Sequence, residues 1–314
     1  MSQPERTQGG VKPSLAAASM PGHNAVAEAG LAIPPPSSRT PADVQWNTKN
    51  LGLRLGSDFL SALTAGSLVA PLISIIDRSI MENASGAATL TQSLKTSFKT
   101  LLSRPHAIVL SKPSFLILML YGGTYLTANA LDTAFSTVGN NPASTVTAGT
   151  PKFAASSAAN VGLCIYKDQV FVKLFGPPGR PVAPVTMASY SLFAIRDCMT
   201  IFASFNVPPL VAPLINDRLG PELRKHVSGV TAAQFMAPAA VQLLSTPLHL
   251  LGLDLYNRPR AAAAGAPSAV ERWQLISKAW LPSATARICR IVPAFGIGGV
   301  VNTKVRRNLQ TRWE

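Results

Sequence analysis

The stretch DFLSALTAGSLVAPLISIIDR, from Asp58 to Arg78, decides the fold that this sequence predicts. Its 18 residues from Phe59 to Ile76 carry no charge, and this is about the shortest run that crosses a ~30 Å hydrocarbon layer as a helix. Pro71 lies inside the run, and a proline within a helix removes one backbone hydrogen bond and bends the rod. The stretch therefore predicts a kinked transmembrane helix.

The composition of the chain also points to a bilayer. Of 314 residues, 47% are hydrophobic and only 13% are charged, whereas a soluble domain carries about 25% charged residues. The net charge is +14, but lysine and arginine are scattered between apolar runs and do not gather in one stripe. This layout favours an anionic lipid such as cardiolipin, or an anionic solute, as partner and argues against nucleic acid.

Further apolar runs predict five more membrane spans after the first, which covers about 53–80. They are expected at 112–131, 153–173, 186–213, 227–253 and from Pro282 to about Lys304. Apolar residues at helical spacing predict two short amphipathic surface helices, at Leu90–Leu101 and Val270–Trp280. Residues 1–50 are rich in Pro, Ser, Ala and Gly, so we expect a disordered tail. An even number of spans would place both chain ends on one side of the membrane.

The spacing of prolines indicates an internal repeat, and Pro247 and Pro293 are expected to kink later spans as Pro71 kinks the first. Pro71 and Pro247 are 176 residues apart, which is twice 88, and the midpoint falls beside Asn160. The prediction is therefore an all-α membrane protein, residues 51–314, with six transmembrane helices in three two-helix repeats. The repeats are expected at about 51–140, 141–220 and 221–314.

Two sets of polar residues share an offset within this repeat. Arg78, Lys167 and Asp254 lie seven residues after the three repeat markers, so we expect them to form a latch at one end of the bundle. The alternative is ordinary interfacial charge at helix ends. In the even spans, three asparagines lie six residues after equivalent positions: Asn129, Asn206 and Asn302. We expect them to hydrogen-bond between helices. The alternative is that the match is coincidental.

Three two-span repeats, prolines in the odd spans and the sixth-span motif Arg290-Ile-Val-Pro293 resemble the mitochondrial carrier (solute carrier 25-type) family. The chain resembles a divergent member, because Ile73 and Ile76 follow Pro71 where the family has an acid and a base. The resemblance implies a monomer without cofactors in the mitochondrial inner membrane, with the outer membrane or another organelle membrane as the alternative. It implies alternating-access transport of a small carboxylate or amino acid.

Charged residues within spans are costly in a membrane and indicate function. Arg196 and Asp197 lie in the fourth span, and Arg287 and Arg290 in the sixth. The resemblance implies that Arg196, Asp197 and Arg290 bind substrate in a water-accessible cavity near mid-membrane, with guanidinium on carboxylate and Asp197 on an amino group. The alternative is a structural Arg196–Asp197 pair. The register of the fourth helix stays open, because aligning Arg196 with Arg290 places Pro208 opposite Asn302.

Other function classes find less support. The sequence has only four histidines, no Ser-His-acid constellation and no Cys/His spacing for a metal, so we expect no enzyme, cofactor or metal site. Because the salt-bridge signatures of the carrier family are degraded, the alternative to transport is a non-transporting carrier-fold protein that acts as scaffold, adaptor or insertase.

Overall fold

The computed structural model describes residues 45–147, 149–177, 184–205, 207–218, 220, 229–259 and 267–314. Within these ranges the chain is helical and contains no strand, which confirms the all-α prediction. The predicted tail lies outside the described residues up to position 44.

The described helices follow the predicted segments closely. They are α1 Leu51–Ser85, α2 Leu90–Ser103, α3 Pro105–Val109, α4 Lys112–Val138, α5 Thr150–Leu174, α6 Met187–Phe205, α7 Val207–Arg218, α9 Gly229–Asn257, α10 Ala269–Cys289, the π-helix η2 Val292–Gly298 and α11 Gly299–Gln310. The three expected kink prolines all lie inside helices: Pro71 in α1, Pro247 in α9 and Pro293 in η2.

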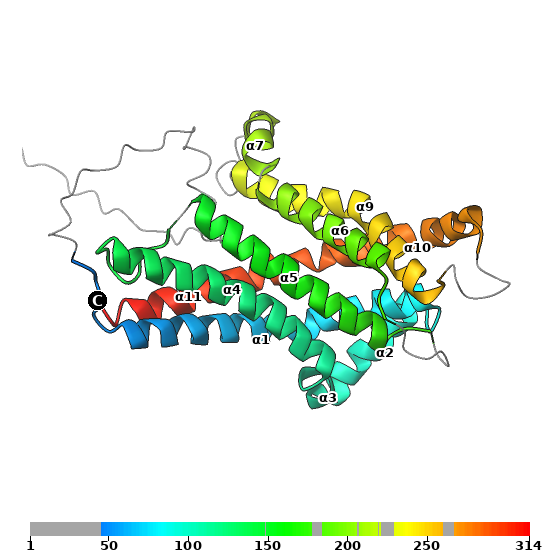
Figure 1. The fold of residues 1–314 in the computed structure, drawn as a ribbon, viewed down its shortest axis with the longest axis horizontal. Helices are drawn as coiled ribbons and strands as arrows, with labels where there is room; N and C mark the ends of the chain where they lie inside the picture. Colours follow the sequence, from blue (N-terminus) through cyan, green and yellow to red (C-terminus); the bar gives the residue numbers. More distant parts are fainter. Residues whose placement is uncertain are drawn as a thin grey trace, which may run out of the picture.

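The long helices form an elongated bundle in which neighbours in sequence are neighbours in space (Figure 1). α1 packs on α4, α4 on α5, α5 on α6, α6 on α9 and α9 on α10, while η2 and α11 return to α1. These six helical segments therefore close a ring. Both ends of the described chain meet at one end of the ring, where Asn50 Nδ2 donates to Trp313 O at 3.2 Å and Trp313 Nε1 to Ser57 Oγ at 2.9 Å.

Four of the described helices are long and apolar enough to cross a membrane: Leu51–Ser85, Lys112–Val138, Phe235–Asn257 and Ala269–Gln310. α5 and α6 are not among them, so the six-span prediction is not confirmed. The physical reason lies in their charges. α5 carries Lys167 and Asp168 in its interior, and α6 carries Arg196 and Asp197.

One of the two surface-helix predictions needs correction. α2 agrees with it: its N-cap Thr89 accepts from the backbone of Gln92, and Leu102 is exposed. The second predicted surface helix is not separate, since α10 begins with a capping box at Ser268 and continues through Pro282 to Cys289. A proline deletes only one hydrogen bond, and here the helix continues through Pro282.

Candidate functional site

Six charged side chains meet inside the ring and are here called the central cluster. They come from α1, α5, α6 and the residue that follows α10: Asp77, Lys167, Asp168, Arg196, Asp197 and Arg290. All except Arg290 are buried. Three carboxylates face three cations, so the central cluster carries no net charge.

Asp77 ties three elements together. Its Oδ2 lies 2.7 Å from Lys167 Nζ of α5, and Arg290 Nη1 donates to its Oδ1 and Oδ2 at 2.8 and 3.0 Å. Lys167 also lies 2.6 Å from Asp168 Oδ1, so this lysine bridges two acids. Buried ion pairs hold only when each charge keeps a partner, and here every charge does.

Arg196 is the most connected member of the central cluster. Its Nη2 lies 2.7 Å from Asp168 Oδ2 and 2.5 Å from Asp197 Oδ1, and Nε donates to Asp197 Oδ1 at 2.9 Å. Its Nη1 lies 2.8 Å from His249 Nδ1 of α9. Because a guanidinium can only donate, Nδ1 must accept, and His249 is therefore a neutral imidazole with its proton on Nε2. The Phe193 ring lies 5.7 Å from Arg196 Cζ.

Three buried side chains of this region have the spacing of metal ligands. Cys164, Asp168 and Asp197 bring ligand atoms within 4.8 Å of one another. Arg196 Nη2 donates to all three, at 3.4 Å in the case of Cys164 Sγ. The guanidinium thus contacts every member of this donor set, and a metal ion would have to displace a cation that is already in place.

Arg287 of α10 lies beside the central cluster but is held differently. Its side chain is 2% exposed, and its Nε donates to Gln242 Oε1 at 2.9 Å. Among the described residues it forms no ion pair. Gln242 lies seven residues before His249 on the same face of α9, and His249 contacts Arg196, so Arg287 is joined to the central cluster through this helix. Arg287 therefore adds one uncompensated positive charge next to a neutral cluster.

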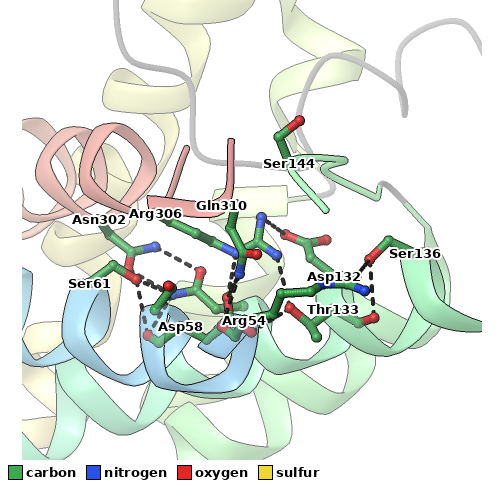
Figure 2. A network of polar contacts seen from close by, with 12 residues as sticks. Arg54, Asp58, Ser61, Asp132, Thr133, Ser136, Ser144, Asn302, Arg306 and Gln310 are labelled. Carbon is green, nitrogen blue, oxygen red and sulfur yellow. Dashed lines mark hydrogen bonds and ion pairs between the residues drawn. The ribbon is translucent and has the colours of Figure 1, made fainter. Parts of the chain in front are cut away.

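A second network, the terminal network, joins α1, α4, α5 and α11 where the chain ends meet (Figure 2). Arg306 Nε donates to Asp58 Oδ1 at 2.8 Å, and Lys152 Nζ lies 2.7 Å from Asp132 Oδ1. Arg54, Thr133, Ser136 and Gln310 add hydrogen bonds. Asp58 and Asp77 are 19 residues apart on α1, or about 28 Å at 1.5 Å per residue, so the two networks lie at different depths.

Two of the three predicted inter-helix asparagines meet in this terminal network. Asn129 Nδ2 donates to Asn302 Oδ1 at 2.9 Å, and Asn302 Nδ2 returns a bond to Asn129 Oδ1 at 3.0 Å. Asn129 also donates to Ser61 Oγ at 3.1 Å. Asn206 lies outside the described residues.

The structure does not bring the expected latch residues together. Lys167 pairs with Asp77 and Asp168, Arg78 pairs with Glu82 on its own helix at 2.7 Å, and Asp254 pairs with Arg258 and Arg272. The expectation of a three-way latch is wrong in its pairing, because a shared repeat offset fixes depth along a helix and not the direction of the side chain.

The predicted substrate residues have mixed outcomes. Arg196 and Asp197 form the pair that was the structural alternative, and Arg290 belongs to the same cluster through Asp77. Arg196 is 2% exposed, so it faces ion-pair partners and not the open cavity expected for it. Sequence reasoning missed Asp77, Asp168 and His249. All three lie inside predicted spans, where any ionisable residue indicates function.

Comparison with known proteins corrects the predicted family. The family model described as "Probable citrulline exporter" matches residues 61–310. No curated protein matches the chain. The resemblance to the mitochondrial carrier family is therefore wrong, since the matched family is a different one. The match supports membrane transport of a small metabolite and confirms the prediction that the chain is not an enzyme.

Proposed function

Because the chain belongs to the probable citrulline exporter family, we propose that it carries citrulline or a similar amino acid across a membrane. Citrulline is a zwitterion with a neutral side chain, so it brings one carboxylate and one ammonium group. The observation that carries the proposal is the central cluster, in which three cations and three carboxylates balance within the ring. Such a cluster can exchange its internal bonds for bonds to a zwitterion without a change in net charge.

We propose that Arg196, Asp197 and Arg290 form part of this substrate site. Arg196 and Asp197 face each other, and Arg290 shares Asp77 with Lys167, so each group has a partner that it could exchange for substrate. Alternating access would then open one end of the ring at a time. The terminal network holds one end, and the pair of Asp254 with Arg272 holds α9 to α10 towards the other.

We further propose that α5 and the α6–α7 segment complete six spans in three repeats, from about 51–140, 141–220 and 221–314. What supports this is the closed ring of six segments, in which α5 and α6 occupy the third and fourth places. At 1.5 Å per residue, the 25 residues of α5 measure about 38 Å, enough to cross a ~30 Å core. Their charges face partners inside the ring, so lipid does not have to accommodate them.

An anionic lipid such as cardiolipin and the mitochondrial inner membrane remain our proposals for partner and location. Support comes from the net charge of +14 and from a cavity of about 250 Å³ that is lined by residues of α1, α3, α4 and α5, with Arg78 and Lys112 among them. Anionic headgroups favour such basic sites. Fractionation of cells that express the tagged chain tests the location. Thermal melting of the purified monomer with cardiolipin, compared with phosphatidylcholine, tests the lipid partner.

The test of function is efflux of labelled citrulline from proteoliposomes that contain the purified full chain. We expect movement of citrulline, loss of movement in Arg290→Ala, and impaired movement in Arg196→Lys, because an ammonium cannot reproduce the guanidinium fork. Arg258→Ala is the matched control, since its side chain is 33% exposed. If no amino or carboxylic acid moves with the intact protein, the transport proposal fails and the non-transporting scaffold, adaptor or insertase takes its place.

A further inference from the structure

We infer that Arg287 is the residue that receives the carboxylate of the transported amino acid, and that the free oxygen of Asp197 receives its ammonium group. This inference rests on the proposed function and assigns the two ends of the substrate. It adds a third arginine to the proposed site, in which Arg196 and Arg290 hold the carboxylates of Asp197 and Asp77.

The first step is the state of Arg287 itself. Its side chain is almost completely buried, yet its hydrogen-bond partner is the neutral amide oxygen of Gln242. A buried cation without a counter-ion is costly inside a membrane protein, and such groups are retained where they bind a ligand or move a charge. An incoming carboxylate would supply the missing negative charge.

The second step is that the other arginines of this region are occupied. Arg196 is bound by Asp168 and Asp197, and Arg290 by both oxygens of Asp77. A substrate carboxylate would have to displace a protein carboxylate from either of them. At Arg287 it displaces nothing, because no described carboxylate pairs with this guanidinium.

The third step is how Arg287 is held. Gln242 takes the Nε proton, and its own Nε2 donates to Pro238 O at 3.1 Å, so the amide is fixed on α9. The two terminal nitrogens of Arg287 remain for a ligand, and they present the planar fork that matches a carboxylate. Gln242 is therefore a positioning residue for Arg287.

The fourth step concerns the opposite end of the zwitterion. Asp197 Oδ1 accepts from Arg196, whereas Oδ2 is buried and has no hydrogen-bond partner. Gln242, which holds Arg287, lies seven residues before His249 on α9, so these two side chains share a face of the helix about 10 Å apart. His249 contacts Arg196, the ion-pair partner of Asp197, so Arg287 and Asp197 lie along one side of α9. A ligand with an ammonium next to a carboxylate would satisfy both side chains at once, which neither a simple acid nor a simple amine could do.

The test is thermal melting of the purified full chain with L-citrulline or with its carboxamide, which keeps the ammonium but lacks the negative charge. We expect citrulline to raise the melting temperature of the intact protein and the carboxamide to bind about 10- to 100-fold more weakly, as for the loss of a hydrogen bond to a charged group. Arg287→Met should bind the two compounds equally. Without ligand, Arg287→Met should melt higher than the intact protein, because it removes an uncompensated buried charge.

The matched control is Arg272→Met, which removes another buried arginine but one that pairs with Asp254. It should melt lower without ligand and should still distinguish citrulline from the carboxamide. The inference is overturned if Arg287→Met melts at a lower temperature than the intact protein, or if it still binds citrulline more tightly than the carboxamide. The transport proposal would stand in either case. Should Arg287→Met not be obtained folded, Gln242→Leu must weaken the preference for citrulline, and an unchanged preference would count against the assignment. Failure of the intact protein to bind or move citrulline would remove both proposals.

Discussion

Replacing Arg196 by methionine removes the cation that joins α5, α6 and α9. In the intact protein its guanidinium contacts Asp168 at 2.7 Å, Asp197 at 2.5 Å and His249 at 2.8 Å. Methionine fills much of the volume, so the main consequence is electrostatic. Asp168 keeps Lys167 at 2.6 Å, but Asp197 loses its only ion-pair partner among the described residues.

The expected cost follows from that orphaned carboxylate. Breaking a buried ion pair by removing one partner costs about 3–5 kcal/mol, because the other charge is left buried. At roughly 2–4 °C per kcal/mol for a chain of this size class, the melting temperature should fall by about 6–20 °C. Adding Asp197→Asn to Arg196→Met removes the orphaned charge, so the double variant should regain about half of this loss or more.

The assay is thermal melting of the four proteins of this double-mutant cycle in one detergent. Arg258→Met serves as the control, because Arg258 is 33% exposed and its partner Asp254 keeps Arg272, so its cost should be about 1 kcal/mol or less. The reasoning is refuted if Arg196→Met melts like the intact protein. It is also refuted if Asp197→Asn brings no recovery, since the charge of Asp197 would then not be the source of the loss.

Arg306→Leu should destabilise the chain by about 3–5 kcal/mol in the same melting assay, because it leaves Asp58 buried without its cation. If the variant is as stable as the intact protein, the terminal network does not stabilise the fold. Gly298→Ala should cost about 1–3 kcal/mol, since a Cβ there would lie 2.5 Å from Tyr125 Oη, whereas Gly299→Ala, with nothing within 4 Å, should be tolerated. Tags at the two chain ends should be equally accessible to protease on one face of sealed vesicles; opposite accessibility would exclude the closed ring as a six-span topology.

The parts of the fold that sequence could predict are those that depend on local pattern. Uncharged runs of about 20 residues predict α1, α4 and α9, because length and polarity alone decide whether a helix can cross a bilayer. The reciprocal bond between Asn129 and Asn302 also follows from a spacing argument, since both lie at the same depth of even helices. These features require no knowledge of how each helix is rotated.

The partners within the site could not be predicted, because they depend on that rotation. Asp77 and Arg78 are adjacent in sequence, yet successive residues of a helix point about 100° apart. Asp77 therefore faces the ring interior and binds Lys167 and Arg290, while Arg78 turns outward to Glu82 and the Phe175 ring. The repeat offset selected Arg78, one residue away from the side chain that the site uses.

The sixth segment connects the two networks, and its backbone is irregular between them. Arg290 lies in the central cluster and Arg306 in the terminal network, with the π-helix η2 between them. A π-helix leaves the regular i to i−4 pattern, and within a membrane the backbone groups that this frees need partners from neighbouring helices. Tyr125 of α4 supplies one by donating to Ala294 O at 2.7 Å. The irregular stretch is thereby stabilised from outside, so one hydrogen bond from α4 supports the backbone between the segment that carries Arg290 and the segment that Arg306 binds to α1.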